Sequence, residues 1–246
     1  KRDQCRPNPS DLNQAGYYCF DSGTPLTATT RNAAFWSASC ALAAAKEVSA
    51  NKSRVAYALC RPPGHHASRS LSGGYCYFNN AAIAVEELRK NGGRIAVLDI
   101  DFHHGNGTQS IFFRDKDVLF VSIHGDPRKY YPYFSGHSNE TGIGLGEGTT
   151  LNFPLPGKCD GQEYFRVLSR KAIPAIRRFQ PKALVISAGF DTYHKDPVGD
   201  FSLRTADFFA IGEALAHLDL PTVIVQEGGY CTSALGANVT ALLSAF

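Results

Sequence analysis

The chain has 246 residues, of which 43% are hydrophobic and 19% charged, so its composition is that of a globular protein and excludes wholesale disorder. The net charge is +3 and the basic residues are scattered, which argues against a nucleic-acid surface. No apolar run approaches the ~18 residues of a membrane span, and the length favours a single domain over residues 1–246.

The predicted elements alternate between helix and strand from residue 31 onward, whereas residues 1–30 are polar and turn-rich and predict a loop or arm. An alanine-rich helix comes first, over residues 31–49, with a threonine pair before it as the expected N-cap. There follow, in chain order, a strand over 54–60, a helix over 79–91, a strand over 94–101, a short helix over 107–113, a strand over 118–124, a helix over 162–179 that Pro174 should kink or split, a strand over 183–189, a helix over 205–218, a strand over 221–229 and a helix over 233–246. Apolar strands alternating with helices predict a three-layer α/β/α fold around a mainly parallel sheet.

The seven cysteines are odd in number and include no CxxC pair, so neither a disulfide framework nor a zinc knuckle is predicted. We expect free, mostly buried thiols in a reducing compartment. No signal peptide opens the chain, and we therefore expect a cytoplasmic protein.

Histidine and aspartate collect where the predicted strands end. RPPGHHA, FHHGNG, GDP and FDTYHKDP follow four of the strands, and EGGY closes another. Six of the eight histidines lie at these strand ends, five in the quoted segments and His124 directly before GDP. Because parallel sheets bind ligands outside the carboxyl ends of their strands, the site is predicted at that edge.

The segment DIDFHH has the composition of a metal site. Asp99, Asp101 and His103 share one face of an extended chain, and two converging carboxylates require a cation or proton between them. Asp191 could supply a further carboxylate from another strand end. Oxygen and nitrogen ligands suit zinc, iron or manganese, and three protein ligands with an open position are typical of a catalytic metal. The alternative is that Asp99 or Asp101 only caps the following turn.

Three further segments could complete a catalytic pocket. His65 and His66 follow a rigid Pro-Pro-Gly turn and, as neutral imidazoles, suit proton transfer near pH 7, with Asp99 able to hold one ring. In EGGY, the glycines permit close approach of the backbone to a ligand, and Tyr230 could donate a hydrogen bond to a developing oxyanion. The aromatic segments GGYCYFNN and YYPYF predict the walls of a narrow slot. Surface histidines and ordinary aromatic packing are the alternatives.

The motifs RPPGHHA, GGYCYFNNAA, DIDFHHGNGTQ, SIHGDP, SAGFD with a downstream DP, and EGGY together resemble the arginase–deacetylase superfamily. Within it they are similar to the histone deacetylase and acetylpolyamine amidohydrolase family, in order over residues 55–246. The stretch SIHGDPRKYYPYFSGHSNETG, followed by LNFPLP, resembles most the bacterial acetylpolyamine amidohydrolases and the class II deacetylases.

The resemblance implies a role for each matching residue. The implied ligands of Zn²⁺, or of Fe²⁺, are Asp101, His103 and Asp191. The implied catalytic residues are the tandem His65 and His66, the carbonyl-polarising Tyr230, Asp99 behind the first histidine, and Asn106 beside the second. A structural K⁺ or Na⁺ is implied at Asp99, Asp101, His103, Ser122 and Ile123. Implied walls of the substrate tunnel are Gly74, Tyr75, Phe134, Val198 and Gly229.

The implied reaction is metal-dependent hydrolysis of an amide that carries an acetyl group, on an acetylpolyamine or an acetyl-lysine peptide. The metal and Tyr230 would polarise the carbonyl, while His66 would take a proton from water and return it to the leaving amine. Asn106 replaces the Asp of class I enzymes and should leave His66 less basic. The alternatives are a related hydrolase of another amide or a guanidino group, and a silent acyl-amine binding module, which would have lost a histidine or Tyr230.

Two features depart from the family pattern. The N-terminal segment that members usually carry, with an early strand and part of the substrate rim, has no counterpart in this sequence. Val198 stands where polyamine-preferring animal enzymes place a glutamate, so an acid that reads a cationic tail must come from Asp11, Asp21 or a partner subunit. Similar amidohydrolases are dimers, and a homodimer is therefore expected, with no nucleic-acid or membrane partner.

Overall fold

The computed structural model describes residues 17–246, in which six strands form one parallel sheet in the order β1-β6-β5-β2-β3-β4. The strands are β1 Val55–Ala58, β2 Ile95–Asp99, β3 Val118–Gly125, β4 Thr150–Leu155, β5 Ala183–Ala188 and β6 Thr222–Gln226. The α-helices are α1 Thr30–Ser49, α2 Asn80–Arg89, α3 Asn106–Phe112, α4 Gly161–Val167, α5 Ile173–Phe179, α6 Thr205–Ala216 and α7 Thr232–Leu243. A 3₁₀ turn, η3 Gly144–Gly146, and a π turn, η4 Leu168–Ala172, complete the set.

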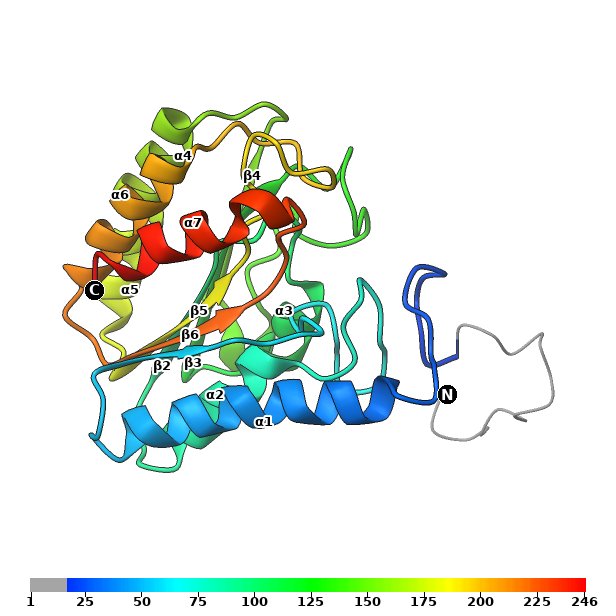
Figure 1. The fold of residues 1–246 in the computed structure, drawn as a ribbon. Helices are drawn as coiled ribbons and strands as arrows, with labels where there is room; N and C mark the ends of the chain where they lie inside the picture. Colours follow the sequence, from blue (N-terminus) through cyan, green and yellow to red (C-terminus); the bar gives the residue numbers. More distant parts are fainter. Residues whose placement is uncertain (1–16) are drawn as a thin grey trace.

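Helices cover both faces of the sheet, which confirms the predicted α/β class (Figure 1). On one face α1 and α2 pack small side chains, such as Ala45 and Val85, against Val97 and its neighbours. On the other face α4 to α7 pack larger side chains, such as Phe208, against Leu98 and its neighbours. Successive strand residues face opposite layers, so both are buried, and this explains the continuous apolar runs in the sequence.

Strand β4 is missing from the sequence prediction because Pro154 interrupts its pattern. In the structure β4 pairs only with β3, and Pro154 lies opposite His124 in that pairing. An edge strand leaves one side of its backbone unpaired, so a proline without an N–H is tolerated there. Four of the other five predicted strands are shorter than expected, for example Val55–Ala58 instead of 54–60, whereas β3 runs one residue further, to Gly125.

One predicted helix feature needs correction, the threonine cap of α1, whereas the predicted interruption of the helix over 162–179 is confirmed. Thr29 occupies the N-cap position of α1 but makes no side-chain cap, and its hydroxyl lies 3.2 Å from that of Thr27 instead. The predicted helix over 162–179 is divided into α4, the π turn η4 and α5. Pro174 lies in the first turn of α5, so the π turn directly precedes the residue that lacks a backbone N–H.

The described part of the predicted arm, residues 17–29, is irregular and pairs with the body of the protein through a bridge between Cys19 and Ser72. Asp11, one of the acids considered for substrate recognition, lies outside the described residues. None of the helices in residues 17–246 has the length and apolar character needed to cross a membrane.

Candidate active site

The segments that follow β2, β5 and β6 converge with the loop after β1 at the carboxyl edge of the sheet. Asp101 and His103 come directly after β2, Asp191 after β5 and Tyr230 after β6. Strands β2 and β5 are neighbours, with Asp99 level with Ser187, so their following segments start side by side. The sheet topology therefore brings together side chains that are up to about 130 positions apart in the sequence, as expected at a parallel edge.

Asp101, His103 and Asp191 form a compact group in which one ligand atom from each residue lies within 4.8 Å of the others. The Nδ1 atom of His103 is 2.9 Å from Oδ2 of Asp191 and 3.3 Å from Oδ1 of Asp101. Backbone N–H groups hold the remaining carboxylate oxygens: Phe102 donates to Asp191 at 2.8 Å and Gly228 to Asp101 at 2.9 Å. The group is thus fixed by backbone donors from two segments, those that follow β2 and β6.

The electrostatics of this group fit a divalent cation. Burial and the neighbouring charge of Asp101 raise the pKa of Asp191 to about 7. Burial alone would lower the pKa of His103, but hydrogen bonds and charge from the two aspartates raise it to about 9. Two buried carboxylates that compete for one imidazole would be neutralised by a bound M²⁺. Two oxygens and one nitrogen are ligands that Zn²⁺ and Fe²⁺ accept.

The first of the tandem histidines is paired with a carboxylate. Nδ1 of His65 lies 2.9 Å from Oδ2 of Asp99, and both side chains are buried. Burial alone would lower the pKa of His65, but the negative charges of Asp99 and Asp101 outweigh it and raise this pKa well above its usual value. His65 is therefore held in a cationic form beside the metal-ligand group.

The second histidine has a neutral partner. Nδ1 of His66 lies 2.7 Å from Oδ1 of Asn106, the first residue of α3. An amide oxygen only accepts hydrogen bonds, so the proton is on Nδ1 and Nε2 has a free lone pair. Burial and the nearby charges of His65 and His103 lower the pKa of His66 well below its usual value. His66 is consequently a neutral imidazole able to accept a proton.

Tyr230 is positioned by an aspartate to which the sequence analysis gave no role. Oδ2 of Asp196 accepts from the backbone N–H of Tyr230 at 2.6 Å and of Cys231 at 2.9 Å, while its Oδ1 accepts from Val198 N–H at 3.0 Å. Burial raises the pKa of the Tyr230 hydroxyl, which keeps it protonated as a donor. The available signal was the Asp-Pro pair downstream of β5, because a carboxylate in a turn often accepts from following N–H groups.

Glu227 is a second positioning residue that the sequence analysis missed. Its Oε2 accepts from the N–H groups of Gly64 at 2.6 Å and His65 at 3.1 Å, and its Oε1 lies 3.3 Å from the hydroxyl of Ser187. Glu227 is buried, and this burial raises its pKa to about 7. It joins the end of β6 to the turn that carries the tandem histidines, although in sequence it is only the first letter of EGGY.

A cavity of about 300 Å³ opens onto this group. The residues that line it are Asp21, Ser22, Gly23, His66, Gly74, Tyr75, His103, Tyr131, Val198 and Tyr230. The predicted wall residues Gly74, Tyr75 and Val198 are among them. Phe134 is not: its side chain is 61% exposed and packs edge-on against Phe20, while Tyr131 of the same aromatic segment occupies the wall. Gly229 also lies elsewhere, in an adjoining depression.

The residues expected around a monovalent cation are close to the metal-ligand group. Asp99 is level with Ser122 in the pairing of β2 with β3, and Ile123 is the next residue of β3. Oδ1 of Asp99 accepts from the N–H of Asp101 at 3.1 Å, and the Ser122 hydroxyl lies 2.8 Å from Nδ1 of His124. All five expected residues thus belong to β2, β3 or the segment that directly follows β2.

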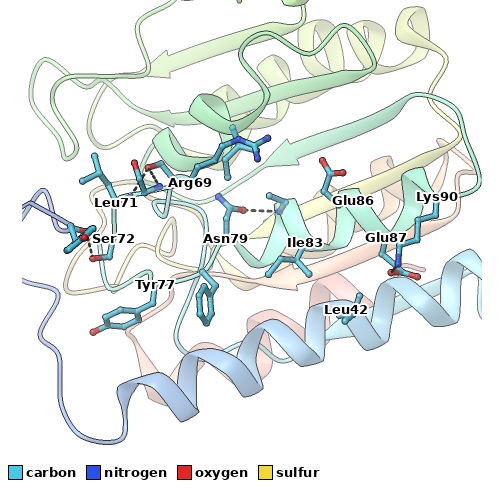
Figure 2. Close-up of a pocket in the computed structure, with 16 residues that line it drawn as sticks. Leu42, Arg69, Leu71, Ser72, Tyr77, Asn79, Ile83, Glu86, Glu87 and Lys90 are labelled. Atoms are coloured by element: carbon cyan, nitrogen blue, oxygen red, sulfur yellow. Dashed lines mark hydrogen bonds and ion pairs between the residues drawn. The ribbon is translucent and has the colours of Figure 1, made fainter. Parts of the chain in front are cut away.

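A larger depression, of about 630 Å³, lies over α2 on the other side of the 68–72 loop (Figure 2). Its labelled residues include Arg69, Glu86 and Lys90, and Asn79 caps α2 by accepting from the N–H of Ala82 at 2.8 Å. None of the residues predicted for catalysis or metal binding lines it. The smaller cavity is therefore the candidate active site.

Known proteins agree with this geometry. An acetylpolyamine amidohydrolase 2 from Pseudomonas aeruginosa is 46% identical over 244 residues, which cover 99% of this chain and 70% of that protein. The acetylpolyamine amidohydrolase of Mycoplana ramosa is 41% identical, covering 96% and 69%. The crystal structure of an acetylpolyamine aminohydrolase from Burkholderia pseudomallei superposes with a TM-score of 0.93 at 46% identity, covering 98% of this chain and 70% of that chain. Residues 2–246 match the histone deacetylase domain, and the chain belongs to the histone deacetylase family, as its motifs predict.

Proposed function

We propose that this chain is a zinc-dependent hydrolase that removes the acetyl group from an acetylated polyamine. The observation that carries the proposal is the placement of the Asp101–His103–Asp191 group below a narrow cavity that His66 and Tyr230 also line. A metal ligand, a neutral base and a protonated phenol then face the same small volume. These are the groups that amide hydrolysis by an activated water requires.

Each of these side chains has a defined task in the reaction. A divalent metal held by Asp101, His103 and Asp191 would polarise the acyl carbonyl and lower the pKa of a water molecule beside it. His66 accepts a proton from the attacking water at Nε2 and passes it to the nitrogen of the leaving amine. Tyr230 donates a hydrogen bond to the carbonyl oxygen as negative charge develops there.

The two tandem histidines carry different charges and have different roles in the proposed reaction. His65, held cationic by Asp99, contributes positive charge near the developing oxyanion. His66 stays neutral because burial and the charges of His65 and His103 lower its pKa, and its partner Asn106 adds no negative charge to oppose them. A base and a cation of the same residue type are thus maintained side by side, with ring centroids 4.0 Å apart.

Zinc is the proposed metal, with Fe²⁺ as the alternative that the same ligands accept. A K⁺ or Na⁺ ion is proposed at Asp99, Asp101, His103, Ser122 and Ile123, where buried negative charge adjoins strand β3.

The relatives named acetylpolyamine amidohydrolases favour an acetylpolyamine over an acetyl-lysine peptide as substrate. Gly74, Tyr75, Val198 and Tyr131 are the proposed walls around its aliphatic chain.

The proposal includes the domain organisation, the oligomeric state and the cellular location of the protein. Residues 1–246 are proposed to act as one deacetylase domain and to form a homodimer, for which the exposed Tyr133 and Phe134 near the cavity offer an apolar surface. Of the described cysteines, all six are free and three are buried, which supports a reducing, cytoplasmic location. Light scattering of the purified protein would determine the oligomeric state directly.

Acetate release tests the proposed activity. Zinc-loaded protein is given N-acetylputrescine and an acetyl-lysine peptide side by side, and the assay is repeated with a hydroxamate that ligates zinc. Faster, hydroxamate-sensitive release from N-acetylputrescine is the expected result. Faster release from the peptide would reassign the substrate, and no release from either, despite bound metal, would overturn deacetylation as the function.

A further inference from the structure

Asp21 projects from the loop before α1 into the wall of the candidate active site and joins three parts of that wall. Its Oδ2 accepts from the backbone N–H of Gly74 at 2.6 Å and from the hydroxyl of Tyr131 at 2.7 Å. Its Oδ1 accepts from the hydroxyl of Thr24 at 2.9 Å and from Gly23 N–H at 3.0 Å. The carboxylate is therefore held in one orientation by both neighbouring loops.

No cationic side chain within residues 17–246 compensates the charge of Asp21. Its five hydrogen-bond donors, which include the Cys19 thiol at 3.9 Å, are all uncharged groups, and no ion pair with a described Lys, Arg or His involves it. Other aspartates of the described chain do have such partners, for example Asp200 with Lys158 and Asp219 with Arg54. Burial alone would raise the pKa of Asp21, but these hydrogen bonds lower it, so the group is ionised at neutral pH.

Among the described residues that line the cavity, Asp21 is the only one with a carboxylate side chain. The other wall residues are aromatic, apolar or small, including Tyr75, Val198 and Gly74. An uncompensated charge beside low-dielectric walls attracts a cation more strongly than the same charge on an open surface. The cavity thus presents one negative position to any substrate that enters it.

We propose that Asp21 is a specificity-determining residue that selects acetamides carrying a second, positively charged amine. This inference rests on the proposed function, because it assigns substrate preference at the same site. The aliphatic chain of the substrate would lie between Tyr75 and Tyr131, and its ammonium would be attracted to the Asp21 carboxylate. Asp21 also acts as a positioning residue, since the same carboxylate holds Tyr131 and the turn at Gly74.

Charge and positioning can be separated with a matched pair of substrates. N-acetylputrescine carries an ammonium, whereas N-pentylacetamide has a methyl group in its place and is otherwise of the same length. Asp21→Asn removes the charge with little change of shape. The ratio of kcat/KM for the cationic over the neutral substrate should fall by roughly two- to fivefold in this variant, chiefly through KM, as expected for loss of one partly screened ion pair.

Three controls make the ratio decisive. Asp219→Asn removes the same charge at an 88% exposed side chain before β6, at the opposite edge of the sheet, and should leave the ratio unchanged. Tyr131→Phe removes the hydroxyl that donates a hydrogen bond to Asp21 but keeps the charge of the Asp21 carboxylate, so this variant should affect both substrates alike. In the wild type, the ratio should also decrease as salt is added, and this result requires no variant to fold.

Calorimetry gives the dissociation constants of the two compounds, and the ratio of these constants measures the preference for the cationic compound without any turnover. If the wild type binds the cationic compound more tightly and Asp21→Asn does not, the role of Asp21 is supported. This holds even if neither acetamide is hydrolysed, because the absence of hydrolysis would overturn only the proposed function. An equal ratio in wild type and Asp21→Asn, with both compounds bound, overturns the role of Asp21 and leaves the deacetylase proposal intact.

Discussion

Nδ1 of His66 donates to Oδ1 of Asn106 across 2.7 Å, so the imidazole proposed as the catalytic base is oriented by a neutral amide. The adjacent His65 is oriented instead by the carboxylate of Asp99, at 2.9 Å. The two pKa values move in opposite directions: the charges of Asp99 and Asp101 outweigh burial and raise that of His65, whereas burial and the charges of His65 and His103 lower that of His66. Because Asn106 adds no negative charge beside His66, residue 106 is a position at which this pKa can be changed.

Asn106→Asp should move the acid limb of the pH profile to higher pH. A carboxylate beside Nδ1 favours the protonated ring and raises the pKa of His66. A base with a raised pKa is protonated, and inactive, over a wider acid range, so kcat/KM should begin to fall about one pH unit or more earlier on acidification. The measurement is kcat/KM for an acetamide between pH 5 and 9.

A control for added charge is Asn91→Asp, at an exposed position beyond the end of α2. It introduces the same charge far from His66 and should leave the acid limb in place. An Asn106→Asp profile that coincides with the wild-type profile would show that His66 is not the group whose protonation limits activity.

Tyr230→Phe should lower kcat strongly while the protein keeps its metal. The phenol is not part of the Asp101–His103–Asp191 group, and Asp196 holds the backbone, not the ring, of residue 230. Loss of one oxyanion donor typically costs about 10²- to 10³-fold in kcat. Metal content by mass spectrometry and kcat are measured on the same sample. Full activity of the variant would exclude the hydroxyl from the reaction.

The order of strands and helices could be predicted because the strands are buried on both faces and the helices between them are amphipathic. The convergence of His65, His66, Asp101, His103 and Asp191 could also be predicted, since the carboxyl ends of parallel strands meet at one edge. Strand β4 could not, because an edge strand containing Pro154 lacks a continuous apolar pattern. Elements that are buried on both sides therefore leave the clearest pattern in the sequence.

The cavity wall was less predictable than the group below it. Two aromatic residues of one segment, Tyr131 and Phe134, have equivalent local patterns, and only the packing of the 130s loop decides that Tyr131 faces the cavity. Glu227 and Asp196 act through hydrogen bonds to the backbone N–H groups of distant residues. Such contacts depend on how loops meet in space, and residue spacing alone carries no information about them.

Gly74→Ala should abolish most activity by displacing His66. Gly74 has φ +57°, and a Cβ atom there would lie 2.1 Å from Cδ2 of the imidazole, so the ring must shift. A misplacement of about 1 Å in a catalytic group can cost on the order of 100-fold in rate. The expected result is a loss of this order in kcat/KM for an acetamide substrate.

Gly92→Ala is the matched control for backbone strain. Gly92 has φ +73°, but a Cβ atom there meets nothing within 4 Å. Both variants should lose about 1–2 kcal/mol of stability from the left-handed backbone, measured by thermal unfolding, yet only Gly74→Ala should lose its activity. Equal kcat/KM values for the two variants would contradict the contact between residue 74 and His66.

Removal of the metal should destabilise the protein more at pH 7.5 than at pH 5.5. In the metal-free protein the pKa of Asp191 is raised to about 7 and that of His103 to about 9, so the folded state binds protons more tightly than the unfolded chain does. This stabilisation is present at low pH and is lost as pH rises through these values. A bound cation replaces the protons, and the stabilisation that it provides therefore grows with pH.

Thermal unfolding of chelator-treated and zinc-reloaded protein should show a difference in Tm that is larger at pH 7.5 by at least about 3 °C, which corresponds to roughly 1 kcal/mol for a domain of this size. Asp191→Asn should remove most of the metal-dependent difference at both pH values. A difference in Tm that is the same at the two pH values would contradict the proposed competition between protons and metal at this group.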